Sequence, residues 1–408
     1  MKCRHCNSEL THTFIDLGSS PPSNSYLTEQ SIRESEKWYP LKVMVCDDCW
    51  LVQTEDFVGA SEMFSDEYAY FSSFSSSWLE HAKCYVEKVA SRFNLNERST
   101  VVEIAANDGY LLQYVQEKKI PCYGIEPTHS TAIAAREKGI DIIEEFFGVE
   151  KAIELENQGR KAALIAANNV LAHVPDINDF VKGFSILLDA DGVATFEFPH
   201  LLNLVEKVQF DTIYHEHYSY LSLLTVHTIF EANGLTVFDV EEIPTHGGSL
   251  RVYAQRSDTK VHPINSSVAE LHKKETRLGM NAVEFYQGFQ PKVEKIKLDF
   301  LEFLLKAKHQ GKEVAAYGAA AKGNTILNFA GVRPDLLSFV VDRNPTKQGK
   351  FMPGSRIPIV EEQQLKKIKP DYVVILPWNL KSEVMKQLNY IESWSGQFVT
   401  AVPTLEII

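Results

Sequence analysis

Residues Ser99–Pro127 read STVVEIAANDGYLLQYVQEKKIPCYGIEP, and this stretch decides the fold of the middle of the chain. Its pattern predicts a strand at Val101–Ile104, a helix at Tyr110–Gln116 and a second strand at Cys122–Ile125. A turn of small and polar residues, AANDG, separates the first strand from the helix. This order predicts a Rossmann-type β-α-β unit, in which a ligand lies at the carboxyl ends of the strands.

The turn of this unit is poorly suited to a dinucleotide. It lacks the G-x-G-x-x-G pattern, whose glycines let a pyrophosphate approach the backbone. Ala105, Ala106 and Asn107 occupy that approach, and Asp108 places a negative charge there. A cationic sulfonium with an amino-acid tail suits the turn better. Glu126 ends the second strand, where it is placed to accept hydrogen bonds from two ribose hydroxyls. The turn therefore favours S-adenosylmethionine (SAM) over NAD.

The same alternation continues along the chain. Further strands are expected to end at Asp141–Ile143 and to run through Ala162–Asn168 and Val193–Phe198. Phe146 and Phe147, just after the first of these, are available to pack on an adenine. The central part is therefore expected to be a parallel sheet with helices on its faces.

The motif DTIYHEHYSY, Asp211–Tyr220, follows the last of these strands on the ligand-binding side of the predicted sheet. Histidine is the side chain most readily used as a base near neutral pH, and tyrosine hydroxyls can donate to an oxyanion. The spacing H-E-H differs from the helical zinc signature H-E-x-x-H. His173, just past an earlier strand, lies at the same predicted edge. The alternative is a polar turn whose histidines are structural.

Two cysteine pairs, Cys3-x-x-Cys6 and Cys46-x-x-Cys49, lie near the N-terminus. Two such knuckles can supply four thiolates to a tetrahedral Zn²⁺. Four protein ligands leave no open coordination position, so the predicted zinc is structural.

An aromatic, serine-rich segment, residues 64–77, precedes a predicted helix that its serines can cap. Tyr68, Tyr70 and Phe71 make it a candidate lid over a site, and the alternative is a packed linker. Further along, the polar turn HGGSLR holds two glycines and Arg251, which could meet a carboxylate or phosphate.

The C-terminal part begins a second β-α-β unit. Strands are expected at Glu313–Tyr317 and Phe339–Val341, with the turn GAAAKGNT after the first. The turn lacks the lysine that follows the second glycine of a P-loop, which argues against nucleotide hydrolysis. Lys322, Arg343 and Lys347 add positive charge at one edge, where the diphosphate of a nucleotide-linked substrate could bind. The alternative is a degenerate duplicate used for packing alone.

The whole chain sets further bounds. Its 408 residues are expected to form two or three domains. The formal net charge of −13 argues against a general nucleic-acid binder. No apolar run is long enough to span a bilayer, and the N-terminus MKCRHCNSEL lacks a signal-peptide core. We therefore predict a cytoplasmic protein.

Together these segments resemble a known family, the sugar C-methyltransferases that methylate carbon 3 of nucleotide-linked 4-keto deoxysugars. The resemblance covers essentially the whole chain. It is carried by the two cysteine knuckles and by EIAANDG, NVLAHVPD, YHEHYSY, HGGSLR, YGAAAKGN and VDRNPTKQGK, in this order. Two positions depart from the family pattern: Ala105 replaces a glycine, and Arg356 stands where a histidine is common.

The resemblance implies a role for most of the candidate residues. It implies that His217 is the base, with Glu216 and Tyr214 beside it, and that Tyr68, Tyr214 or His173 donates to the enediolate. The cofactor residues expected are Glu103, Ala105, Asn107, Asp108, Gly109, Glu126, Phe147 and Asn168. The expected substrate-binding residues are His246, Arg251, Lys322, Asn324 and Arg343.

The predicted fold class is α/β with three domains. These are a zinc-binding domain at residues 1–65, a Rossmann-like SAM-dependent methyltransferase domain at 66–262, and a helical linker with a second Rossmann-like domain at 263–408. The expected partner is a keto-sugar linked to dTDP or a similar nucleotide, and the expected state is a monomer or weak oligomer. Two competing interpretations are an NAD-dependent nucleotide-sugar oxidoreductase and a non-catalytic zinc and ligand-binding module.

Overall fold

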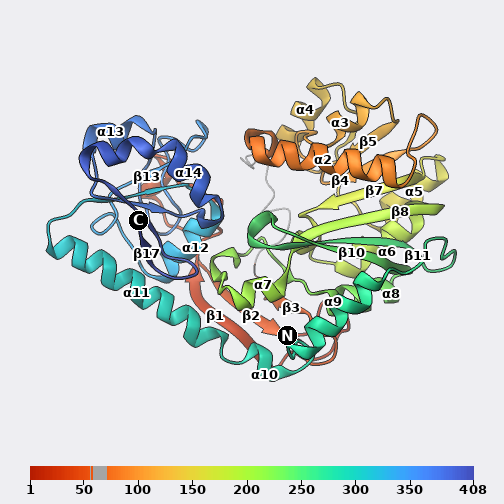
Figure 1. Cartoon of the computed structure of the whole chain (residues 1–408), viewed down its shortest axis with the longest axis horizontal. Helices are drawn as coiled ribbons and strands as arrows, with labels where there is room; N and C mark the ends of the chain where they lie inside the picture. The colour runs from red at the N-terminus through yellow and green to blue at the C-terminus, as the bar shows by residue number, and fades with distance from the viewer. Residues whose placement is uncertain (56, 58–70) are drawn as a thin grey trace.

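The chain forms three β-sheets in the part that the structure describes (Figure 1). The structure is a computed structural model, and it describes residues 1–55, 57 and 71–408. The central sheet and the C-terminal sheet belong to two α/β units that lie side by side in Figure 1. The small N-terminal sheet lies beneath them.

The N-terminal sheet is antiparallel, with the strand order β1-β2-β3-β9. Its fourth strand, β9, lies more than 160 residues after β3 in the sequence. The two strands pair through Val52 with Tyr220 and Gln53 with Ser219. The end of the DTIYHEHYSY motif is therefore part of the N-terminal sheet. The strands are β1 His12–Ser20, β2 Tyr39–Val45, β3 Val52–Thr54 and β9 Ser219–Tyr220.

The central sheet has seven strands in the order β10-β11-β8-β7-β4-β5-β6. The five strands β4 to β8 run parallel, as the sequence predicts, and β10 and β11 add an antiparallel edge. The strands are β4 Val101–Ile104, β5 Cys122–Ile125, β6 Ile142–Ile143, β7 Ala162–Asn168, β8 Leu188–Pro199, β10 Leu235–Ile243 and β11 Ser249–Arg256.

Helices cover both faces of the central sheet. Buried residues of α2, α3 and α4 join one apolar cluster, and those of α5, α6 and α8 join another on the opposite face. The hydroxyl of Ser75 accepts the N–H of Trp78 and so caps α2, as its serine-rich start predicts. The helices are α2 Ser76–Arg92, α3 Leu112–Glu117, α4 His129–Glu137, α5 Val149–Asn157, α6 Ile177–Leu187, α7 Leu201–Glu206 and α8 Leu223–Ala232.

The C-terminal unit repeats the parallel arrangement. Its sheet has the order β14-β13-β12-β15-β16-β17, and only β17 is antiparallel. The linker before it is helical, as predicted: α9 Ser266–Arg277, α10 Val283–Tyr286 and α11 Phe289–His309. The unit itself contains β12 Val314–Tyr317, α12 Ala321–Phe329, β13 Val340–Val341, β14 Ile359–Val360, α13 Gln363–Ile368, β15 Tyr372–Ile375, α14 Lys381–Gln387, β16 Gln397–Thr400 and β17 Glu406–Ile407.

One apolar core joins the N-terminal sheet to the C-terminal unit. It runs from β1 and β2 through α7 to α11, β12 and α12, and it includes a stacked pair, Phe14 and Phe289, with ring centroids 4.6 Å apart. Arg356 adds a polar link, since its guanidinium donates to the backbone oxygen of Ile32 at 3.1 Å. The DTIYHEHYSY motif lies at this junction: His215 contacts Pro40 of β2, and the backbone oxygen of Ile213 accepts from Thr325 of α12.

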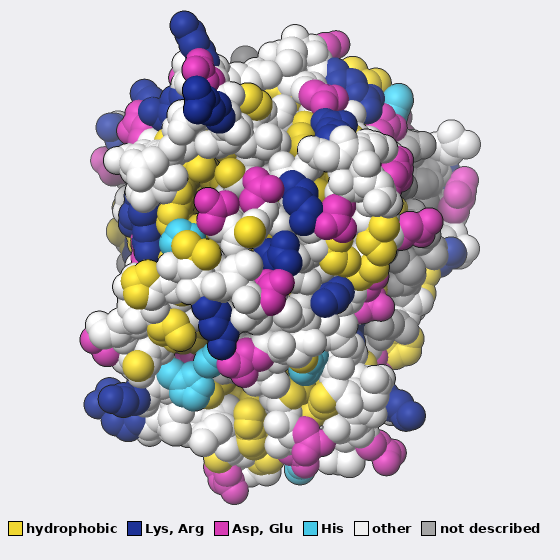
Figure 2. Space-filling view, turned by 90° about the vertical axis from the view of Figure 1, so that its right-hand side faces the viewer, with side chains coloured by type: hydrophobic (Ala, Val, Ile, Leu, Met, Phe, Trp, Pro, Cys, Tyr) yellow, Lys and Arg dark blue, Asp and Glu magenta, His cyan; other side chains and the backbone are white. Residues whose placement is uncertain are grey.

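The outer face of the central unit carries acidic, basic and apolar side chains intermixed, as expected of a solvated surface (Figure 2). None of the helices in the described ranges combines the length and the apolar composition needed to cross a bilayer.

Candidate active site

The turn after β4 has the unusual backbone that its sequence requires. Ala105, Asn107 and Gly109 all have positive φ, at 57°, 50° and 75°. Glycine and asparagine tolerate this region, whereas alanine is strained there. At Gly109 a Cβ atom would lie 2.2 Å from the tip of the Ile140 side chain, so this position with its positive φ favours glycine. Ala105, which departs from the family pattern, therefore occupies a position where the backbone geometry itself favours glycine.

Glu126 and the turn are bonded to each other. The carboxylate of Glu126 is buried at the end of β5 and accepts the backbone N–H groups of Asn107 at 2.8 Å and Thr128 at 2.9 Å. Burial raises its pKa. The hydroxyls of Thr128 and Thr131 also bond this carboxylate, so its predicted hydrogen bonds to ribose hydroxyls stay a prediction.

The surroundings of this turn fit SAM on their own chemistry. The atoms Asp108 Oδ1 and Asn169 Oδ1 are buried and have no hydrogen-bond partner in the described part of the chain. Leaving such groups unpaired costs about 1–3 kcal/mol each, which a polar ligand would recover. The hydroxyl of Tyr110 lies between Glu103 and Asn168, and burial raises the pKa of Glu103 well above its usual range. A set of acidic and polar side chains of this kind suits a sulfonium cation with an amino-acid tail.

The described part of the candidate lid, from residue 71 on, touches this turn. The backbone N–H of Ser72 donates to Asn107 at 2.9 Å, and that of Ser73 donates to Asp108 at 3.2 Å. Tyr68, predicted as an oxyanion donor, lies outside the described residues. Phe147, predicted to pack on adenine, is half-buried and packs edge-on against Phe184 of α6.

His217 is held in one tautomer. Its Nδ1 lies 2.7 Å from the carbonyl oxygen of Thr212, which can only accept, so Nδ1 carries the proton and Nε2 keeps its lone pair. Tyr214 and His173 flank the ring, with centroids 4.0 and 4.6 Å away. Burial, with a contribution from His173, lowers the pKa of His217 well below its usual range. The imidazole is therefore neutral near pH 7 and able to accept a proton.

Glu216 points to a partner that the sequence analysis missed. The amide of Asn24, in the N-terminal loop, donates to both carboxylate oxygens at 2.8 Å. Burial raises the pKa of Glu216 to about 7. The only signal in the sequence was an asparagine in the turn-rich segment SSPPSNSYL, which gave no indication of its partner.

The remaining histidine of the motif has structural contacts. The Nε2 atom of His215 lies 3.1 Å from the carbonyl oxygen of Pro40 and 3.3 Å from that of Tyr39, both at the start of β2. This histidine joins the motif to the N-terminal sheet. For His215, the contacts are therefore those of a structural histidine, the alternative considered for the motif.

The raised pKa of Glu216 makes the stability of the folded protein depend on pH. The folded protein retains a proton on this carboxyl between about pH 4.5 and pH 7, whereas the unfolded chain loses it, so stability falls as the pH rises through this window. We expect Glu216→Gln to raise the free energy of unfolding by about 2–3 kcal/mol at pH 8.5, and by less at pH 5.5. Urea unfolding at both values measures this. Glu206→Gln, at an exposed site on α7, is the control, and an equal effect of both variants would contradict the prediction.

Arg251 meets a carboxylate of its own chain. It lies opposite Glu197 in the pairing of β11 with β8, and its guanidinium donates to Glu197 at 2.6 Å. His81 shares the same carboxylate at 2.8 Å, and the ring of Tyr85 lies under the guanidinium, 4.6 Å away. Arg251 is only 4% exposed, so its predicted contact with substrate stays a prediction.

Lys322 and His246 come together between the central and C-terminal units. The Lys322 ammonium donates to the amide oxygen of Asn379 at 3.0 Å and lies 4.6 Å from the ring of Trp378. Burial and the charge of Lys322 lower the pKa of His246 to about 4. The indole of Trp378 in turn donates to Asp211 at 2.7 Å.

The other two predicted substrate residues differ in their surroundings. Asn324 is buried and donates to the backbone oxygen of Ser23 at 2.5 Å, while its own amide oxygen has no partner among the described residues. Arg343 is exposed, and its guanidinium lies 3.7 Å from Glu362. Asp342 accepts the backbone N–H groups of Ala319 and Asn344, so it closes its own turn as Glu126 does in the central unit.

The four N-terminal cysteines form a compact cluster. The Sγ atoms of Cys3, Cys6, Cys46 and Cys49 all lie within 4.8 Å of one another, and the Cys3–Cys49 and Cys6–Cys46 pairs are 3.5 Å apart. A tetrahedral zinc with Zn–S bonds of about 2.3 Å brings sulfur atoms to about 3.8 Å from each other. The donor set and its spacing therefore fit a structural zinc ion.

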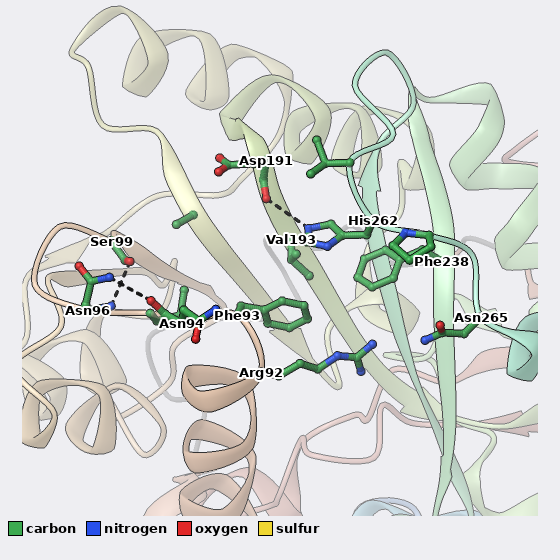
Figure 3. A pocket seen from close by; sticks show the side chains of 14 residues that line it. Arg92, Phe93, Asn94, Asn96, Ser99, Asp191, Val193, Phe238, His262 and Asn265 are labelled. Carbon is green, nitrogen blue, oxygen red and sulfur yellow. Dashed lines mark hydrogen bonds between the residues drawn. The ribbon is translucent and has the colours of Figure 1, made fainter.

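A hollow of about 490 Å³ lies at the opposite edge of the central sheet, near the starts of β4 and β7 (Figure 3). Two of its titratable side chains are already engaged: Arg92 pairs with Asp239 at 2.6 Å, and His262 lies 3.3 Å from the backbone oxygen of Asp191. The candidate catalytic groups instead gather at the carboxyl edge of the strands.

The fold and the site define a SAM-dependent methyltransferase with an N-terminal zinc-binding domain. Three family models match the chain: a putative zinc binding domain at residues 3–64, a methyltransferase domain at 78–240 and a C-methyltransferase C-terminal domain at 244–403. Over its full length the chain is 32% identical to the C-methyltransferase NovU of Streptomyces niveus, of which it covers 96%. The chain belongs to this C-methyltransferase family, and the methyltransferase interpretation is thereby confirmed over the two competing ones.

Solved structures resemble the chain more distantly. The magnesium protoporphyrin IX methyltransferase of Synechocystis PCC 6803, with bound SAM, covers 44% of this chain and 79% of its own at 15% identity, with a TM-score of 0.34. A SAM-dependent methyltransferase of Clostridium acetobutylicum ATCC 824 covers 44% and 92% at 10% identity, with a TM-score of 0.36.

Proposed function

We propose that this C-methyltransferase methylates carbon 3 of a nucleotide-linked 4-keto deoxysugar, with His217 as the general base. The observation that carries the proposal is the fixed tautomer of His217, whose Nε2 keeps a lone pair beside Tyr214 and His173. A ketone at C4 acidifies the proton on C3, which makes its removal by a neutral imidazole chemically reasonable.

The neighbours of His217 suit the charge that this proton transfer creates. Loss of the C3 proton leaves an enediolate with negative charge on oxygen. The hydroxyl of Tyr214 would donate a hydrogen bond to that oxygen, which is typically worth about 3 kcal/mol in such sites, while the neutral ring of His173 packs against the base. Glu216, held by Asn24, would fix the backbone between the two histidine segments, because His173 hydrogen-bonds to the backbone of Glu216.

The cofactor and the nucleotide are assigned to the two α/β units. The turn of Ala105–Gly109 and Glu126 would hold SAM, which supplies an electrophilic methyl group when bound. Lys322, with its positive charge between the units, and Asn324, with its unpaired amide oxygen, are the proposed contacts of the diphosphate and its neighbouring groups. Proximity of two bound reactants can contribute about 7–11 kcal/mol to lowering a barrier.

Cofactor binding is the first test. Calorimetry should show binding of S-adenosylhomocysteine and no binding of NADH. Glu126→Gln should weaken the former, because it removes an acceptor for a ribose hydroxyl. The control is Glu144→Gln, whose carboxylate follows the neighbouring strand and pairs with Arg136 on the surface. Binding of NADH alone would overturn the cofactor assignment.

Substrate class is tested separately with dTDP-linked 4-keto deoxysugars and SAM carrying a ¹³C-labelled methyl group. NMR of the product should show the labelled methyl carbon bonded to C3 of the sugar. Transfer of the label to an oxygen, or to another carbon, would contradict the proposed chemistry while leaving the cofactor assignment intact.

A further inference from the structure

Arg4 lies inside the first zinc knuckle, between Cys3 and Cys6, and its side chain reaches two other segments of the chain. One guanidinium nitrogen, Nη2, donates to the backbone oxygen of Thr54 at 2.9 Å. The other, Nη1, donates to the backbone oxygen of Pro175 at 3.0 Å. One side chain therefore joins the end of β3 to the loop that follows β7.

Each of these segments supports one of the two adjacent histidines. The hydroxyl of Thr54 donates to the backbone oxygen of His217 at 3.2 Å. Pro175 follows His173 by two residues. The guanidinium of Arg4 also lies over the ring of Tyr218, 5.2 Å from its centroid. Arg4 thus contacts Thr54, which bonds the backbone of His217, and Pro175, which lies two residues after His173.

The backbone of Arg4 is held in place by contacts at the zinc knuckle. Its backbone N–H donates to the side-chain oxygen of Gln53 at 2.9 Å, and the amide nitrogen of Gln53 donates to the sulfur of Cys3 at 3.3 Å. Gln53 is fully buried. On the other side of Arg4, Asn178 of α6 donates to the backbone oxygen of His5 at 2.8 Å. A short hydrogen-bonded path therefore leads from a zinc ligand to both histidine segments.

We infer that Arg4 is a positioning residue, which holds His173 and His217 at the separation that proton transfer requires. The inference rests on the proposed roles of the two histidines. Arginine suits this task because its rigid, planar fork can donate to two acceptors in fixed directions at once. A small misplacement of a reacting group, of about 1 Å, can cost about 10²-fold in rate.

The first test is kinetic, with a dTDP-linked 4-keto deoxysugar as substrate. Arg4→Ala should lower kcat about 10- to 100-fold, leave KM for both substrates nearly unchanged, and retain one zinc per chain. Arg4→Lys, which keeps the charge but not the fork, should recover only part of the loss. The matched control is Arg160→Ala. Like Arg4, Arg160 donates to an oxygen of another segment, here Asp141, and lies over a tyrosine ring, here Tyr123, but it is far from the site.

The second test needs no turnover. In protein labelled with ¹³C at the histidine ring, the signals of His173 and His217 can be assigned from His173→Gln and His217→Gln. Arg4→Ala should shift both signals, and Arg160→Ala should shift neither. Unshifted signals would overturn the inference, even if methyl transfer to the sugar is confirmed. Shifted signals in a protein that does not methylate this sugar would show that Arg4 positions the two histidines and would refute the proposed substrate instead.

Discussion

Replacement of His217 by Gln is expected to lower kcat by about 10² to 10⁴, the usual contribution of a positioned general base. The amide fills a similar volume and can still donate to Thr212, but it cannot take up a proton. Binding of S-adenosylhomocysteine should be unchanged, because the cofactor turn lies on other segments. The control is His215→Gln, since His215 contacts the backbone of Tyr39 and Pro40 and has no proposed role in the reaction.

The pH dependence gives an independent check of the same assignment. The base must be neutral, so the rate falls as the pH drops through the pKa of His217. Burial and the neighbouring His173 hold that pKa well below 6.5, and kcat should therefore stay level from neutral pH to below pH 6.5. Near-wild-type turnover in His217→Gln, or a decline in kcat centred above pH 6.5, would contradict the assignment.

Loss of the zinc site is expected to have the largest effect on stability. The binding free energy of a structural zinc ion, about 10–16 kcal/mol in small zinc domains, is as large as the whole stability of a typical domain, about 5–15 kcal/mol. We expect Cys46→Ser, or a strong chelator, to unfold the N-terminal sheet and to abolish methyl transfer, because β3 of that sheet pairs with β9, which belongs to the DTIYHEHYSY motif with the proposed base.

Zinc content, thermal unfolding and activity measured on the same samples test this expectation. Cys84→Ser is the matched control, since Cys84 is an exposed cysteine on α2 outside the cluster. It should keep its zinc and its melting temperature. A Cys46→Ser protein that is zinc-free, folded and fully active would refute the structural role.

Local signals carried most of the fold. Strand positions, the turn after β4, the cap of α2 and the helical linker depend on neighbouring residues, and the structure confirms them. The cysteine knuckles were recognised because metal-ligand spacing is itself local. The exact domain boundaries at residues 65 and 262 stay predictions.

Contacts between distant segments were beyond reach. The pairing of Asn24 with Glu216 joins parts of the chain that no periodicity connects, and the same holds for Arg4 and Pro175. Arg251 shows a subtler limit. Its partner Glu197 follows from the register of β11 against β8, which depends on the antiparallel edge that the sequence analysis did not foresee.

The N-terminal sheet remains incomplete for much of the chain's synthesis. Val52 and Gln53 of β3 pair with Tyr220 and Ser219 of β9, which leave the ribosome long after them. Pairing of strands so far apart in sequence is slow, because a long loop must close before the contact forms. Until then the edge of β3 that pairs with β9 is open, and an open strand edge is a site where other chains can pair. The first sheet of the chain is therefore completed only after more than half of the sequence, up to β9 at Ser219–Tyr220, has been made.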